Sequence, residues 1–228
     1  MTSESKSVLR KLQRIPTRFW VYGIALALAV VTVSYVRIRR EAVERLHRAI
    51  TRNDLEQVKS CLKWVEIDAM SSGKVRYTPL IAAISHSSNG DETIVWYLLE
   101  NGADWRKPDS NDYTPLHRAI HYGSVNIVKT LIDKGADVDS DAGGRCPIIT
   151  SAVRRGNLEV VRLLVENGAN VNATDQMGHT ALFYLVNFPD SRNCSIIAEY
   201  LRKHGAEEPE IASWLRRETR NPVDGTDP

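Results

Sequence analysis

The chain has 228 residues, of which 43% are hydrophobic and 25% charged, so it carries enough apolar side chains to fold around a core. Its net charge of +2 conceals an asymmetry: residues 1–52 contain 11 Lys and Arg against 3 Asp and Glu, whereas residues 53–228 contain 19 against 25. The larger part is therefore acidic. This argues against a nucleic-acid-binding protein, because neutralising phosphates requires clustered Lys and Arg on one face.

The first predicted element is a membrane-spanning helix over residues 19–36, preceded by a basic tail over residues 1–18. The segment contains eighteen residues and no charge, and at about 1.5 Å per residue its helix approaches the thickness of the hydrocarbon core of a bilayer. Trp20 lies near one end and Tyr35 near the other, where aromatic side chains meet the membrane surface. We therefore expect a single-pass membrane protein.

Two other interpretations of this segment stay open. A buried core helix is disfavoured because the segment has no polar stripe. A cleaved signal peptide fits the basic leader and the small residues of Ala27-Leu28-Ala29, although the apolar stretch is long for a signal. Five Lys and Arg before the segment and six after it leave the orientation undetermined. The three cysteines, an odd number without a C-x-x-C unit, favour a reducing compartment, so we expect the rest of the chain to face the cytoplasm.

A repeat of about 33 residues follows this segment. Gly102, Gly135, Gly168 and Gly205 succeed one another at intervals of 33, 33 and 37 residues. Upstream of the first two glycines, Tyr77-Thr78-Pro79-Leu80 returns as Tyr113-Thr114-Pro115-Leu116. The run Thr114-Pro115-Leu116-His117-Arg118-Ala119 resembles the signature of the ankyrin repeat, and the resemblance covers about residues 43–215.

The resemblance implies an all-α fold, an ankyrin-repeat solenoid over residues 40–217 behind the transmembrane helix. Its five units fall at about residues 43–73, 74–110, 111–143, 144–177 and 178–215, and a flexible tail occupies residues 218–228. The residues themselves agree, because Thr can cap a helix and Pro suits its first turn. The second helix of four units carries apolar residues four apart, a stripe that can be buried only against a neighbouring unit: Ile94, Ile127, Val160 and Ile197, with Leu98, Leu131, Leu164 and Leu201.

Several departures from the period predict local irregularities. Residues 85–89 contain three extra residues and should bulge where two helices join. Residues 148–155 carry one extra residue, and residues 188–191 surround an excess of four. Arg202 replaces the apolar residues of the inner units, which predicts that the last unit is a cap with one face in solvent.

Motifs of catalysis are missing from the sequence: it has no phosphate-binding loop, no G-x-S-x-G and no H-E-x-x-H. His117 and His121 are four residues apart, which is a metal-ligand spacing, yet no carboxylate or cysteine is placed to complete a site. The resemblance instead implies that His117 makes a structural hydrogen bond between repeats. We predict a protein that is not an enzyme and uses neither a cofactor nor a metal.

In the family that the chain resembles, partners bind a concave surface made of hairpin tips and first helices. The tips correspond here to residues 105–112, 138–145 and 171–178, and the exposed first-helix positions include Arg154. Trp, Tyr and Arg dominate interface energetics. The candidate protein-binding residues are Trp105, Arg106, Tyr113, Arg118, His121, Tyr122 and Arg155. Trp105 also aligns with Val138 and Val171, so packing between repeats is an alternative role for it.

Trp96 is the eighth candidate. It aligns with Lys129, Arg162 and Glu199, at a position expected to face water, so it marks either a second contact surface or a side chain covered by residues 85–89. The predicted function is a protein-interaction module displayed at a membrane, with an unidentified protein partner and no nucleic acid. The alternative is a structural subunit of a membrane complex, whose anchor helix packs on others through small residues such as Gly23 and Ala27.

Overall fold

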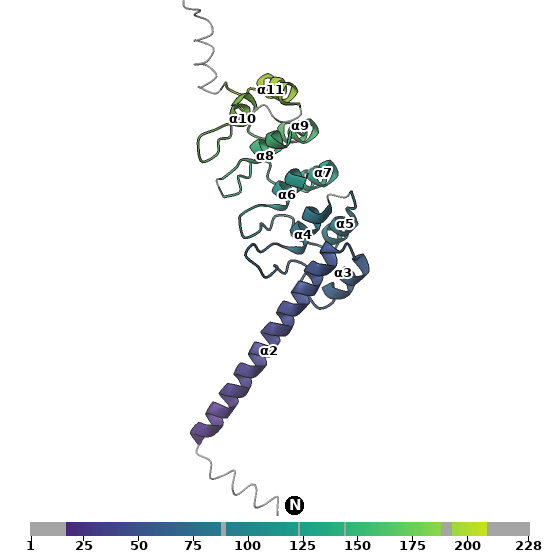
Figure 1. Cartoon of the computed structure of the whole chain (residues 1–228), viewed down its shortest axis with the longest axis vertical. Coiled ribbons are helices and arrows are strands. Elements are labelled where there is room, and N and C mark those ends of the chain that lie inside the picture. Colours follow the sequence, from purple (N-terminus) through teal and green to yellow (C-terminus); the bar gives the residue numbers. More distant parts are fainter. Residues whose placement is uncertain (1–16, 88–89, 123, 144, 188–192, 209–228) are drawn as a thin grey trace, which may run out of the picture.

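The computed structural model describes residues 17–87, 90–122, 124–143, 145–187 and 193–208. Short helices form antiparallel pairs, the pairs stack on one another, and long loops project from one side of the stack (Figure 1). The helices are α2 (Thr17–Thr51), α3 (Leu55–Leu62), α4 (Pro79–His86), α5 (Thr93–Glu100), α6 (Pro115–Tyr122), α7 (Val125–Asp133), α8 (Ile148–Arg155), α9 (Leu158–Glu166), α10 (Ala181–Asn187) and α11 (Cys194–Lys203). The predicted solenoid is confirmed in this part of the chain.

Side chains at the helix starts define where the helices begin. The Thr78 hydroxyl accepts a hydrogen bond from the backbone N–H of Ile81 at 3.2 Å, and Pro79 follows it at the first helical position. The same cap is made by Ser124 at the start of α7 and by Asn157 at the start of α9. These caps satisfy N–H groups that lack a partner within the helix. The predicted capping roles of Thr and Pro are therefore confirmed for α4.

The core is a continuous column of apolar side chains between the two rows of helices. Leu98, Leu131, Leu164 and Leu201, one from each of α5, α7, α9 and α11, are all completely buried. The first helices α4, α6, α8 and α10 pack on one another in that order and supply the other side of the column. Each helix pair therefore buries its apolar stripe against its neighbours, as expected of a solenoid.

The loops between pairs are also tied to one another. The backbone N–H of Ser110 donates to the carbonyl of Arg76 at 2.8 Å, and the Ser110 hydroxyl accepts from the N–H of Arg76 at 2.9 Å. Further along, the N–H of Asn170 donates to the carboxylate of Asp139 at 2.7 Å. These bonds join successive loops into a row along the edge of the stack.

Residues 19–36 do not form the predicted membrane-spanning helix. They belong to α2, a helix of 35 residues, and no helix in the described part of the chain is long and apolar enough to cross a membrane. After Val36, α2 continues through Arg37, Arg39 and Arg40 into the stack.

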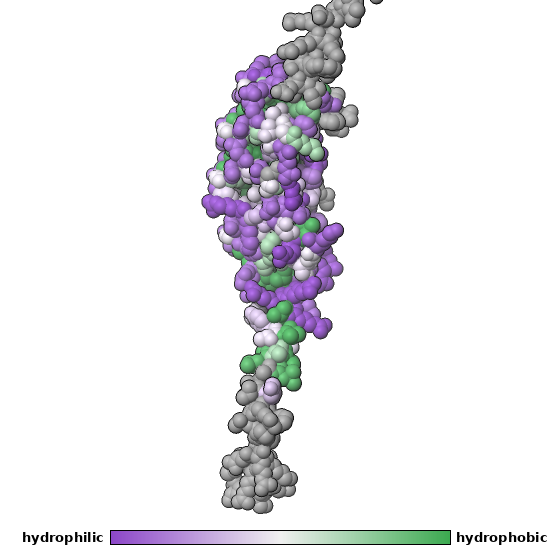
Figure 2. Space-filling view, turned by 90° about the vertical axis from the view of Figure 1, so that its left-hand side faces the viewer, coloured by the Kyte–Doolittle hydropathy of each residue, from purple (hydrophilic) through white to green (hydrophobic). Residues whose placement is uncertain are grey.

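The last turns of α2 are the first helix of the first repeat. Figure 2 shows the apolar side chains of α2 outside the stack, next to a largely hydrophilic stack surface. After Val43 the helix enters the stack, where Leu46, Ala49 and Ile50 are buried against α3 and α4. Residues 46–50 read Leu-His-Arg-Ala-Ile, identical to residues 116–120 in α6. One unbroken helix therefore combines an apolar part outside the stack with the first helix of the first repeat. The predicted boundary at residue 40 falls inside this helix.

The predicted irregularities have mixed outcomes. Several of the predicted segments lie outside the described residues: residues 88–89 of the expected bulge, the insertion at 188–191, and the tails 1–16 and 218–228. The prediction of an extra residue in residues 148–155 was wrong. Helix α8 has eight residues, as α6 does, and Pro147 occupies the N-cap position of α8. Arg202 faces solvent and pairs with Glu208 at 2.7 Å, in keeping with a terminal cap.

Candidate protein-binding groove

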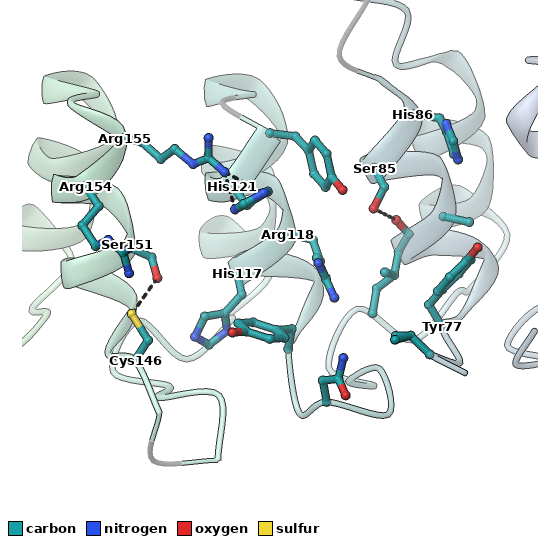
Figure 3. A pocket seen from close by; sticks show the side chains of 16 residues that line it. Tyr77, Ser85, His86, His117, Arg118, His121, Cys146, Ser151, Arg154 and Arg155 are labelled. Atoms are coloured by element: carbon teal, nitrogen blue, oxygen red, sulfur yellow. Dashed lines mark hydrogen bonds between the residues drawn. The ribbon is translucent and has the colours of Figure 1, made fainter. Parts of the chain in front are cut away.

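A groove of about 900 Å³ runs across the first helices α4, α6 and α8 and the loop ends beside them. In Figure 3 the side chains of Arg155, His121 and Arg118 point into the space in front of these helices. Its lining combines tyrosines (Tyr77, Tyr113, Tyr122), arginines (Arg118, Arg154, Arg155) and histidines (His86, His117, His121). Such residues bring large contact areas together with positive charge, and both are common features of protein-binding surfaces.

The floor of the groove is held by an ion pair between Arg118 and Asp109. The Arg118 Nε donates to the Asp109 carboxylate at 3.0 Å, and Nη2 donates to the same oxygen. The other carboxylate oxygen accepts from the backbone N–H groups of Asn111 at 2.8 Å and Tyr113 at 3.1 Å. Asp109 is fully buried, so its charge requires these donors. The pair therefore fixes the loop before α6 to the helix itself.

Arg155 is oriented by a neutral histidine from the neighbouring repeat. Its Nη2 lies close to both ring nitrogens of His121, 2.6 Å from Nε2, and because a guanidinium can only donate, the ring accepts and is neutral. Burial lowers the pKa of His121, and the positive charges of Arg155 and Arg118 lower it further. This contact links α8 to α6 across the groove and leaves the charge of Arg155 without neutralisation by His121.

His117 has a structural role. Its Nδ1 lies 2.9 Å from the Thr114 hydroxyl, and its ring meets the Tyr113 ring edge-on at 5.8 Å between centroids. Burial is the largest influence on this imidazole and lowers its pKa to about 4, so it is neutral at physiological pH. Within the described residues no group of three or more His, Cys, Asp or Glu could hold a metal ion. His117 and His121 therefore act here through hydrogen bonds and packing.

The structure brings five of the eight candidate binding residues together in this groove: Tyr113, Arg118, His121, Tyr122 and Arg155. Trp105 is half-buried against the core and packs within 3.9 Å of the position that a Cβ on Gly135 would take. It thus serves the alternative role of packing between repeats. Arg106 stacks on the Trp105 ring at 3.8 Å and does not line the groove.

Trp96 does not have the exposed position that its alignment suggested. It lies on α5, on the opposite side of the helix pairs from the groove, and is half-buried against the core. The exposed tryptophan among the described residues is instead Trp64, after α3, with 87% of its surface accessible. The alignment of the repeats could not predict that Trp64 is exposed. Trp64 lies in the first unit, which lacks the Thr-Pro pair by which the other units were aligned.

Sequence reasoning also missed part of the groove itself. Tyr77 and His86 lie in it because α4 is in line with α6 and α8, whereas Arg154, which also lines it, was already among the expected exposed positions. Tyr77 was recognisable, since it precedes Thr78 as Tyr113 precedes Thr114. Cys146 also lines the groove, with its Sγ 3.3 Å from the Ser151 hydroxyl.

The chain matches a model of a known protein family. A family model described as ankyrin repeats (3 copies) matches residues 46–142 and again residues 138–211. The first match begins inside α2, where the helix enters the stack, and the second ends just beyond α11. No curated protein matches the chain.

Proposed function

The chain belongs to the ankyrin-repeat family, and we propose that it is a non-catalytic module that binds a protein partner along the groove of α4, α6 and α8. The observation that carries this proposal is the lining of the groove, in which three tyrosines and three arginines from three successive repeats face one space. Aromatic and Arg side chains are the commonest anchors of protein interfaces.

The chemistry of the groove favours binding over catalysis. Its most buried ionisable groups are held by neighbouring residues: Asp109 is paired with Arg118, and Nδ1 of His117 is hydrogen-bonded to Thr114. Catalysis would instead need an acid, base or nucleophile free to face a substrate, with a second group to orient it. The groove is also open and elongated, which suits a polypeptide segment more than an enclosed small molecule.

Site-specific photo-crosslinking in cells tests this function. A benzoylphenylalanine is placed in the full chain at Tyr122, which is exposed in the groove, or as a matched control at Lys129, which is exposed on α7 outside it. We expect discrete crosslinked proteins from position 122 that are absent from position 129. Crosslinks from position 129 without any from position 122 would place the binding surface elsewhere and refute the proposal.

A further inference from the structure

The groove is positively charged within an acidic stack, and this determines which partner it fits. Among the described residues that line it are three Arg, and none is Asp or Glu. Residues 53–228 as a whole have 25 Asp and Glu against 19 Lys and Arg. The groove therefore differs in charge from the acidic part of the chain in which it lies, and the inference below rests on the function proposed for it.

Two of the three arginines in the groove are available to a partner. Arg118 is neutralised by the buried carboxylate of Asp109 beneath it. Arg154 instead lies over the Tyr184 ring at 5.7 Å, and Arg155 contacts neutral His121. No carboxylate of the described residues lies within ion-pair distance of either Arg154 or Arg155. Acidic side chains of a partner would therefore meet two guanidinium groups, from consecutive residues of α8, that have no competing acidic neighbour among the described residues.

The opposite edge of the groove limits the partner further. The loop tips carry exposed carboxylates, including those of Asp112, Asp139 and Asp141, interspersed with the exposed Arg106 and Arg145. A nucleic-acid backbone carries regularly spaced phosphates and is held by unbroken rows of Lys and Arg, which these mixed tips do not provide. A peptide can place acidic side chains toward α8 and neutral ones toward the tips. The charge distribution therefore favours a polypeptide over a nucleic acid.

We propose that the groove binds an extended acidic segment of the partner protein, with Asp or Glu side chains on Arg154 and Arg155 and an apolar or aromatic side chain on the tyrosines. Neighbouring packed helices lie about 8–10 Å apart, so α4, α6 and α8 together span roughly 20 Å. At about 3.3 Å per residue, roughly six extended residues cover this distance. The recognised motif is thus short and carries its acidic residues at the end that meets α8.

Selection from a displayed library of random 16-residue peptides on the full chain tests this inference. Enriched peptides are then measured by fluorescence anisotropy against Arg155→Glu, Arg155→Gln and Tyr122→Ala. The control is Lys129→Glu, which makes the same charge change as Arg155→Glu outside the groove. Circular dichroism establishes that each variant is folded. We expect enriched peptides to be acidic, with affinity reduced about tenfold or more by Arg155→Glu, less by Arg155→Gln, and little changed by Lys129→Glu. Raising the salt concentration should weaken binding.

The other outcomes separate this inference from the proposed function. Enriched peptides that are neutral or basic but still depend on Tyr122 would overturn the acidic partner and leave the binding groove in place. If no peptide depends on either Tyr122 or Arg155, both the inference and the proposed function fail. A single-stranded oligonucleotide that binds the chain but not its Arg155→Glu variant would identify a nucleic acid as the occupant. That result would overturn the proposal of an acidic peptide segment.

Discussion

The carboxylate of Asp109 shows how one residue can organise a repeat. It accepts two backbone N–H groups of its own loop and two donors from Arg118 on the helix that follows. Asp175, 66 residues later, repeats the arrangement: it accepts the N–H groups of Met177 and His179, and the Tyr184 hydroxyl donates to it at 2.5 Å. A loop Asp and a helix donor nine residues later therefore form a recurring unit, in which Arg and Tyr are alternative donors.

Arg118→Met is expected to lower the free energy of unfolding by about 3 kcal/mol, because it leaves the fully buried Asp109 carboxylate without its cation. Arg154→Met, at an exposed residue in the same groove, should cost less than about 1 kcal/mol. Urea unfolding followed by circular dichroism measures both. The double variant Asp109→Asn with Arg118→Met should regain stability relative to Arg118→Met alone, since the charge has been removed. Equal losses for Arg118→Met and Arg154→Met would show that the pair contributes nothing.

Buried His117 should make the stack sensitive to mild acid. Its pKa is about 4 when folded against an ordinary value of 6.5, so between these values the unfolded chain binds more protons than the folded one. Stability is therefore complete above about pH 6.5 and falls as the pH drops toward 4, by about 3 kcal/mol in total. The backbone of Cys146 and the charges of Asp141 and Asp109 oppose this lowering of the pKa, whereas the charge of Arg118 adds to it.

Unfolding free energies of His117→Gln measured between pH 4 and 7 test this origin of the sensitivity. The variant should show a shallower pH dependence than the parent chain, whatever its stability at neutral pH. His47 has its pKa lowered by burial as well, so a smaller slope should persist and should flatten further when His47→Gln is added. An unchanged slope in the double variant would assign the acid sensitivity to other groups.

At the scale of elements, the repeat spacing predicted most helices, and α2 shows where it could not. Gly102, Gly135 and Gly168 end helix pairs with φ near +88°, a conformation that favours glycine, so their period located the units. The first unit has neither a preceding helix-ending glycine nor a Thr-Pro pair to mark its start. Glu44 and Arg45 occupy the places of Thr114 and Pro115. Because α2 runs through this point without a break, Pro would disrupt it there, and the helix start that marks other units does not exist.

The repeat spacing also predicted part of the groove, because it shows which residues occupy equivalent positions in successive repeats. His121 and Arg155 could be chosen because their positions within the repeat place them on first helices, and Tyr113 because it lies just before one. The pairing of Arg118 with Asp109, and the contact of Arg155 with His121 from the preceding repeat, depend on side-chain conformations across loops and helices. These contacts decide which cations are free, and spacing alone carries no information about them.

Truncation can separate the part of α2 that lies outside the stack from its last turns, which form the first helix of the first repeat. A chain that begins at residue 39 keeps Leu46, Ala49 and Ile50, which cover α4, whereas one that begins at residue 54 exposes the α4 side chains beneath them. The first should unfold in the same cooperative transition as the full chain. The second should melt at least about 10 °C lower, because each lost Leu or Ile contact is worth a few kcal/mol. Thermal melts of the purified chains measure this, and equal melting temperatures would show that the first repeat starts after α2.

At the scale of the whole molecule, each repeat packs mainly on its neighbours. Among the described residues, the main contacts of α6 are with α4, α7 and α8, and those of α10 are with α8 and α11. Stability is then close to a sum over repeats and the interfaces between them. A central repeat is held by two interfaces, while α10 and α11 share an interface on one side and present the other to solvent at Arg202. The C-terminal pair should therefore open first.

Two chemically identical substitutions test this difference. Leu131 in α7 and Leu201 in α11 occupy equivalent positions and both are completely buried, so each Leu→Ala change removes the same packing, worth about 2–5 kcal/mol. In Leu201→Ala the last repeat can unfold alone, so hydrogen exchange should rise in α10 and α11 while α4 to α8 keep their protection. In Leu131→Ala the interfaces on both sides are weakened, so protection should fall across the stack and the urea midpoint should drop. Global loss of protection in Leu201→Ala would mean that the repeats unfold as a single cooperative unit, and the terminal pair would then be as firmly held as the centre.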